Sequence, residues 1–188
     1  MDLTEFQAFF DACVGSWSTE RTYHYLSHGE VERSHTDFQI EPISSDRKAR
    51  VLSDNAQPAP SDLDILCGYH LHFDTVSDKG ERVSQSLNIL FVPKDGEVNS
   101  VGTYIDGLYL RDRAYEEARP VVSDFRFNTQ TRELLMTTHY TRVVSVDSIT
   151  LVNPNLRVRK ILNYRRPQAE KPLSEVILIG FGVEQKTV

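Results

Sequence analysis

The sequence predicts an all-β fold, a closed antiparallel barrel of about ten strands preceded by one short helix. Two observations predict it. Apolar residues follow a helical spacing only near the start of the chain, and from Gly15 onward short segments rich in Thr, Tyr, Phe, Val and Ile alternate with turn residues. With 188 residues, 39% of them hydrophobic and 26% charged, the chain has the composition of a single globular domain spanning residues 1–188.

The first element is a short amphipathic helix. Its apolar residues recur at steps of three and four, which places them on one face: Leu3, Phe6, Phe10 and Cys13. Asp2 and Glu5 are spaced as a capping pair at its start, and Gly15 is expected to stop it. We expect this helix to close one end of the barrel.

The strands follow in chain order, with turns expected at 78–80, 93–96, 106–107 and 128–131. They are residues 17–26, 31–43, 47–52, 66–76, 82–92, 96–104, 108–113, 121–127, 133–140, 142–152, 156–164 and 175–183. So many strands exceed the usual number in an open sheet, which favours a calycin-like or lipocalin-like barrel with room for one small ligand. Strand spacing alone leaves a β-sandwich open as the alternative. Residues 54–64 are expected to form a surface loop rather than a flap over the barrel mouth.

Charge and cysteine content exclude several classes of protein. The net charge of -6 argues against a nucleic-acid partner. The segment 142–171 nevertheless carries seven Lys and Arg against two Asp and Glu, which suggests a local site for a small anionic ligand. Two cysteines are too few for a disulfide framework, and no apolar run approaches the roughly 20 residues that span a bilayer. We therefore expect a cytoplasmic protein without membrane insertion.

The motifs of common enzyme classes are missing from the sequence, which has no phosphate-binding glycine loop, no G-x-S-x-G elbow and no H-E-x-x-H helix. His70, His72 and Asp74 share one face of a strand, but a solvated face explains them better than a metal site, and we predict no metal. Cys13, on the apolar helix face, and Cys67, without a flanking base, are not expected to act as nucleophiles.

Two pairs of basic residues are candidates for ligand binding. Arg21 and His24 have opposite strand parity, so only one of them can face inward without a bulge. Arg157 and Arg159 share one strand face, opposite Leu156 and Val158. Parity slightly favours the two arginines outside and the apolar pair in the core. In the alternative arrangement both guanidiniums enter the cavity, where a carboxylate such as that of Asp147 must meet them.

The chain resembles the S/U-type bilin lyases, which attach linear tetrapyrroles to phycobiliproteins. The resemblance covers nearly the whole chain and rests on FFDACVGSWSTERTYHYL, GLYLRDRAYEEARPVVSDFRF, NPNLRVRK and the closing SEV at 174–176. The order of these segments makes the resemblance specific. Asp147 stands where the family commonly has a glutamate, and Trp17 is the only tryptophan, so Tyr69 or Phe73 is expected to build the aromatic wall of the site.

The resemblance implies a barrel that binds a bilin such as phycocyanobilin as its substrate and delivers it to a cysteine of an apo-phycobiliprotein, with no prosthetic group of its own. It implies catalytic roles for Asp147, which would hydrogen-bond the pyrrole N–H groups, and for Arg157. Further ligand-binding residues are then expected at five positions: Arg159, Arg21, His24, Glu175 and Tyr69. Trp17 is expected to pack beneath the helix instead.

The resemblance also implies a location in the cyanobacterial cytoplasm or the plastid stroma, and a homodimer or a paralogous lyase subunit as further partner. The main alternative function is a carrier of the lipocalin or fatty-acid-binding type, in which the same arginines hold one carboxylate and no transfer occurs. A barrel filled by side chains, acting in assembly without a ligand, is the third.

Overall fold

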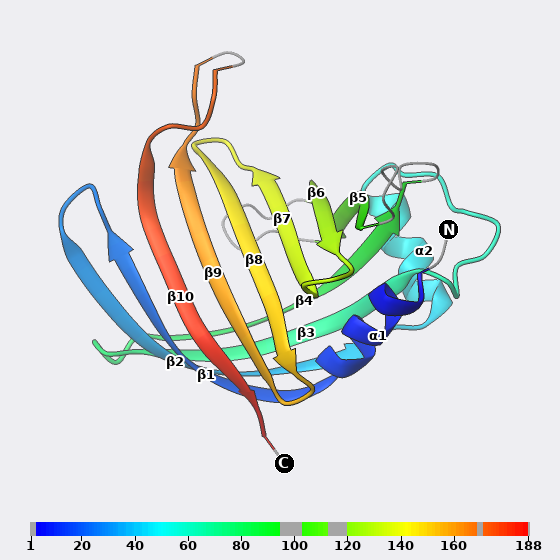
Figure 1. The fold of residues 1–188 in the computed structure, drawn as a ribbon, viewed down its shortest axis with the longest axis horizontal. Coiled ribbons are helices and arrows are strands. Elements are labelled where there is room, and N and C mark those ends of the chain that lie inside the picture. Colours follow the sequence, from blue (N-terminus) through cyan, green and yellow to red (C-terminus); the bar gives the residue numbers. More distant parts are fainter. Residues whose placement is uncertain (1–2, 95–102, 113–119, 169–170, 188) are drawn as a thin grey trace.

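The computed structural model describes residues 3–94, 103–112, 120–168 and 171–187, and within them it has the predicted closed antiparallel barrel (Figure 1). Each strand pairs with the next along the chain, and β1 pairs with β10 to close the barrel. The strands are β1 (Gly15–Tyr25), β2 (Glu30–Pro42), β3 (Cys67–Ser77), β4 (Arg82–Pro93), β5 (Tyr104–Arg111), β6 (Val121–Asn128), β7 (Glu133–His139), β8 (Val143–Asn153), β9 (Leu156–Arg165) and β10 (Val176–Lys186). The sandwich alternative is therefore wrong.

The predicted N-terminal helix is α1 (Thr4–Cys13), and it lies across one end of the barrel (Figure 1). Leu3 occupies its N-cap without a side-chain hydrogen bond, so the expected capping pair does not form there, and Asp2 lies outside the described residues. Gly15 does not cap the helix either, because it is the first residue of β1. The helix buries Phe6, Phe9 and Phe10 into the barrel, where the Phe6 ring stacks on Phe125 with ring centres 5.3 Å apart.

A second helix, α2 (Ser45–Asp54), replaces the strand expected at 47–52. Its buried residues are Lys48, Val51 and Leu52, followed by buried Asn55, a spacing of three and four residues that belongs to a helix and not to a strand. The Lys48 ammonium donates to the carbonyl of Leu63 at 3.1 Å, so its aliphatic stem packs with the apolar face. The helix covers the outer face of the barrel over Leu90 and Leu110.

Two expected turns form and one does not. Residues 78–79 and 129–131 turn the chain as predicted, whereas Asp106 and Gly107 lie inside β5. A Cβ at Gly107 would lie 2.4 Å from the Phe125 ring and 2.4 Å from the Val92 carbonyl, so this glycine serves close packing. The strand expected at 96–104 and the turn at 93–96 fall largely outside the described residues. Residues 55–66 connect α2 to β3 without a helix or strand.

One end of the barrel is filled and the other is open. The filled end is an aromatic floor, in which the α1 phenylalanines pack against the inward side chains of β4 and β6: Phe6, Phe9, Phe10, Phe91, Phe125 and Phe127. Burial of such side chains contributes about 1.5–3 kcal/mol each to folding, so the floor anchors the helix in the barrel. The strand ends away from α1 include the connections from β7 to β8 and from β9 to β10 (Figure 1). Residues at these ends, such as Tyr25, Tyr140 and Val143, line the barrel cavity, and we call this end the mouth.

Candidate functional site

The barrel encloses a cavity of about 440 Å³ above the aromatic floor, so the filled-barrel alternative is wrong. This volume is within the range of small-molecule sites. Aromatic side chains from several strands face it, among them Tyr23, Phe38, Tyr69, Phe73 and Tyr109. Residues 54–64 do not line the cavity, which agrees with a surface loop rather than a flap.

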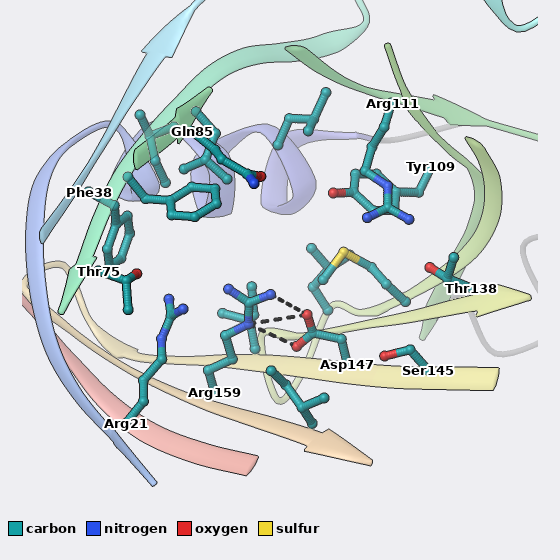
Figure 2. A pocket seen from close by; sticks show the side chains of 18 of the residues that line it. Arg21, Phe38, Thr75, Gln85, Tyr109, Arg111, Thr138, Ser145, Asp147 and Arg159 are labelled. Atoms are coloured by element: carbon teal, nitrogen blue, oxygen red, sulfur yellow. Dashed lines mark hydrogen bonds and ion pairs between the residues drawn. The ribbon is translucent and has the colours of Figure 1, made fainter. Parts of the chain in front are cut away.

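Arg159 and Asp147 form an ion pair on the cavity wall (Figure 2). The Arg159 Nε donates to both carboxylate oxygens of Asp147, at 3.0 and 3.1 Å, and its Nη2 donates to Oδ2 as well. The two residues lie on the neighbouring strands β9 and β8, and both side chains line the cavity. A carboxylate held against a guanidinium in this way can accept a further N–H or exchange its partner for a ligand.

A second network lies deeper, where Glu184 of β10 pairs with two arginines. Its Oε2 accepts from the Nε of Arg157, and its Oε1 accepts from the Nη2 of Arg21 at 3.3 Å. Glu184 has no exposed surface, and only 4% of Arg157 is exposed. The Arg157 guanidinium also lies over the rings of Trp17 and Phe38, 4.7 and 5.1 Å from their centres. Together Arg21, Asp147, Arg157, Arg159 and Glu184 form what we call the charged wall.

The charges of this wall hold each other in the ionised form. Burial by itself would raise the pKa of Glu184, but the guanidiniums of Arg157, Arg159 and Arg21 outweigh it and the net shift is downward. Burial likewise opposes the charge of Arg157, and Glu184 overcomes it, so the pKa of Arg157 is raised. Three guanidiniums against two carboxylates leave the charged wall with one net positive charge.

Arg21 is the member of the wall with spare hydrogen-bonding capacity. Its Nε is buried and has no hydrogen-bond partner among the described residues, and its Nη2 contact with Glu184 is long. Its guanidinium lies 5.9 Å from the centre of the Phe38 ring. A buried donor without a partner is costly unless a ligand meets it, so this position is suited to an anionic group.

The parity preference for exterior arginines is wrong, because Arg157 and Arg159 face inward while Val158 is 40% exposed. The register explains the reversal. Glu184 lies directly opposite Arg157 across the β9–β10 pair, and Gly182 lies between Arg159 on one side and Arg21 on the other. A Cβ at Gly182 would lie 3.2 Å from the Cγ of Arg21, so the missing side chain leaves room for the guanidiniums.

The other predicted site residues divide into two groups. Tyr69 is buried, lines the cavity and stacks on Phe10 at 5.4 Å; burial raises the pKa of its hydroxyl. His24 lies on the outer face, stacked on the ring of Phe181 at 6.1 Å, because it has the opposite parity to Arg21. Glu175 is exposed and pairs with Arg165 at 2.8 Å before β10 begins. The structure thus corrects the expectation that His24 and Glu175 reach the ligand site.

Trp17 packs as predicted, since it is 1% exposed and its indole N–H donates to the Cys13 carbonyl at 2.9 Å. Sequence reasoning missed Glu184 and also Arg111 of β5. Figure 2 shows Arg111 and Tyr109 entering the cavity across from Arg159. The Arg111 Nη2 donates to the Tyr140 hydroxyl at 2.9 Å, and its guanidinium lies over the Tyr109 ring. The alternation of Leu108 and Leu110 with Tyr109 and Arg111 could have indicated this placement.

Neither cysteine is activated. Both are buried free thiols, and burial raises the pKa of Cys13 and raises that of Cys67 to about 11. A nucleophilic thiol needs the opposite shift.

His72 and Asp74 contact each other on the solvent side of β3, while Leu71 and Phe73 line the cavity. The described residues contain no cluster of three or more His, Cys, Asp or Glu side chains suited to a metal. No helix in the described part of the chain is long and apolar enough to cross a membrane.

Comparison with known proteins places these features in one family. Residues 5–187 match the family described as CpeS-like protein. Chromophore lyase CpcS/CpeS 1 of Synechococcus sp. (strain JA-3-3Ab) is 54% identical over 184 residues, which are 98% of this chain and 97% of the relative. Phycocyanobilin lyase subunit CpcS of Picosynechococcus sp. is 22% identical over 152 residues, covering 80% of this chain and 74% of the relative.

A solved structure confirms the fold. The S-type phycobiliprotein lyase CPES from Guillardia theta superposes with a TM-score of 0.74 at 19% identity, over 97% of this chain and 93% of that one. The match over residues 5–187 and the 54% identity together establish descent from a common ancestor. The chain therefore belongs to the CpeS-like family, and the relatives named above are lyases.

Proposed function

We propose that this protein is a bilin lyase: it binds a linear tetrapyrrole in the barrel and promotes its thioether attachment to a cysteine of an apo-phycobiliprotein subunit. The observation that carries the proposal is the charged wall, with its net positive charge and the unpartnered Nε of Arg21, facing an aromatic cavity. The lyase names of the relatives favour this function over that of a simple carrier.

A linear tetrapyrrole has apolar and charged parts that match the aromatic and the charged side chains lining the cavity. Its conjugated body is apolar and flat, and it packs against the aromatic side chains of the cavity. Its two propionates need donors, which Arg21 and Arg159 supply from the charged wall. Arg111 and the Tyr140 hydroxyl, on β5 and in the turn after β7, lie across the cavity and are suited to a carbonyl oxygen of a terminal ring.

Asp147 is the proposed catalytic residue. When a propionate of the bilin accepts some of the guanidinium N–H groups of Arg159, the Asp147 carboxylate becomes free to accept hydrogen bonds from pyrrole N–H groups. Its negative charge then favours the protonated pigment. Protonation makes the ethylidene group of the first ring more electrophilic. The acceptor thiolate then supplies the electron pair of the new C–S bond, and the double-bond electrons move into the conjugated system, where they neutralise the positive charge of the protonated pigment, so the proton already taken up is the only one required. No oxidant and no leaving group are needed.

Arg157 has a different role in this proposal from the catalytic one expected from sequence. It is committed to Glu184 and to the Trp17 ring, so it acts as a positioning residue that holds Glu184, which in turn holds Arg21. The nucleophile comes from the acceptor protein, in keeping with the raised pKa of both cysteines here. The cyanobacterial cytoplasm or plastid stroma as location, and a homodimer or a paralogous lyase subunit as partner, remain predictions.

The test mixes the purified protein with phycocyanobilin and an apo-phycobiliprotein subunit and follows covalent pigment after denaturation in acid. A lyase gives an adduct that survives denaturation, whereas a carrier gives only a reversible complex. We expect Asp147→Asn to bind bilin but to lose the absorbance of the protonated pigment and to slow transfer by about 100-fold or more. Asp37→Asn, a matched change on the outer face, is expected to leave both unchanged. Equal transfer by Asp147→Asn and wild type would overturn the catalytic role of Asp147.

A further inference from the structure

We propose that one side of the barrel mouth is the docking surface for the acceptor protein and that it recognises carboxylates around the acceptor cysteine. We call this surface the basic rim, and it consists of Arg142, Arg166 and Lys171. The inference rests on the proposed function, because it concerns the protein to which the pigment is delivered.

The fold places these cations in two neighbouring connections at the open end. Arg142 is the last residue of the connection from β7 to β8, and Arg166 and Lys171 belong to the connection from β9 to β10; both connections lie on the side of the barrel away from α1 (Figure 1). The backbone N–H of Arg166 donates to the Arg142 carbonyl at 3.0 Å, and its Nη1 donates to the Tyr140 carbonyl at 2.6 Å. These bonds fix the two connections to each other, so the positive charges of Arg142 and Arg166 are held near each other, and Lys171 adds a third cation farther along the β9–β10 connection.

The charges of the basic rim are not neutralised by the protein itself. Among the described residues no carboxylate lies within salt-bridge distance of Arg142, Arg166 or Lys171, and all three are exposed. Other cations near the mouth do have partners, since Arg165 pairs with Glu175 and Lys79 with Glu30. A carbonyl that accepts from Arg166 satisfies a donor without cancelling its charge.

The rest of the chain strengthens the effect of this local charge. The net charge is -6, although residues 142–171 hold seven cations against two acidic residues. The acidic remainder of the chain repels an acidic partner, while the basic rim attracts it, so the opposite charges orient the partner toward the mouth. Because the cavity reaches the mouth at residues such as Tyr140 and Val143, this orientation brings the acceptor thiol to the opening of the pigment site.

The basic rim is distinct from the pigment site. Arg142, Arg166 and Lys171 do not line the cavity, whereas their neighbours Tyr140 and Val143 do. The propionates already meet guanidiniums inside, at Arg21 and Arg159. Surface charges beside the opening are therefore left for a macromolecule, and its carboxylates are the groups they recognise.

The experiment compares Arg142→Glu/Arg166→Glu with a control of equal charge change, Arg47→Glu/Arg50→Glu, at two exposed positions of α2. Pigment affinity is titrated by visible absorbance, and transfer is measured at low and high salt. We expect the rim variant to bind phycocyanobilin as tightly as wild type but to lose about tenfold or more in transfer kcat/KM at low salt, with the difference shrinking as salt rises. The control is expected to transfer like wild type.

Three outcomes would overturn the inference: wild-type transfer by the rim variant, an equal loss in the control, or a loss of pigment affinity that matches the loss of transfer. The last result would assign the basic rim to the pigment. Failure of the proposed function looks different, because wild type itself would then give no denaturation-stable adduct at any salt concentration. Equal melting temperatures of both double variants and wild type verify folding.

Discussion

The aromatic floor and the charged wall enclose the same cavity but are stabilised in different ways. The floor is held by ring contacts, such as the 4.5 Å approach of Phe10 to Phe91, which depend on shape and area and have no strict direction. The wall is held by charges that must match in number and position, because Glu184 has no exposed surface and serves two arginines. A conservative change is therefore tolerated in the floor and damaging in the wall.

The largest expected effect comes from removing the shared carboxylate. Glu184→Gln leaves Arg157 buried without a counter-charge, and breaking a buried ion pair in this way costs about 3–5 kcal/mol. Denaturant unfolding of the variant and wild type measures the difference. Glu175→Gln, which breaks the exposed pair with Arg165, is the control and is expected to cost less than about 1 kcal/mol. Similar losses in both variants would contradict the assignment of Glu184 as the centre of the wall.

The same carboxylate predicts how stability depends on pH. The pKa of Glu184 lies below its ordinary value of 4.5 in the folded protein, because three guanidiniums outweigh the effect of burial. As the pH falls below about 4.5, the unfolded chain takes up this proton first, so the stabilisation is full above that pH and is lost as the pH falls through the folded pKa. We expect the free energy of unfolding of wild type to fall more steeply than that of Glu184→Gln between pH 5 and pH 3. Parallel curves would show that Glu184 is not held ionised.

The floor is expected to respond more mildly. Phe6→Leu keeps an apolar side chain of similar size facing Phe125, so we expect a loss of about 1–1.5 kcal/mol. Phe6 does not line the cavity, and pigment affinity is expected to stay unchanged. Denaturant unfolding and bilin titration measure the two quantities. A loss as large as that of Glu184→Gln would remove the contrast between floor and wall.

The contrast also explains what could be predicted from sequence. The floor helix and nearly all strands follow from local spacing, because apolar residues three, four or two apart define a face. The wall depends on partners from distant parts of the chain: Arg21 and Glu184 are 163 residues apart, and Arg157 and Glu184 are 27 apart. Strand parity places the apolar side chains inside, so it gave the wrong face for Arg157 and Arg159. Here Glu184 supplies a counter-charge and Gly182 leaves space, so the guanidiniums can lie in the interior. In α2 the strand interpretation overlooked Lys48, whose stem completes the buried helical face.

The smallest expected effect concerns the two thiols, which pack in the same hydrophobic cluster as the floor phenylalanines, with Cys13 also lining the cavity. Cys13 and Cys67 are 3% and 6% exposed, and burial raises the pKa of both, so neither supplies a thiolate near neutral pH. Cys67→Ala is expected to transfer pigment at the wild-type rate within about twofold, since it removes only a small apolar group. Alkylation of the native wild-type protein at pH 8 should be slow and should become rapid in denaturant. The prediction fails if the native protein is labelled rapidly and Cys67→Ala also loses pigment transfer. A thiol of the lyase itself would then take part in the transfer, and the catalytic residues would lie in the floor and not in the charged wall.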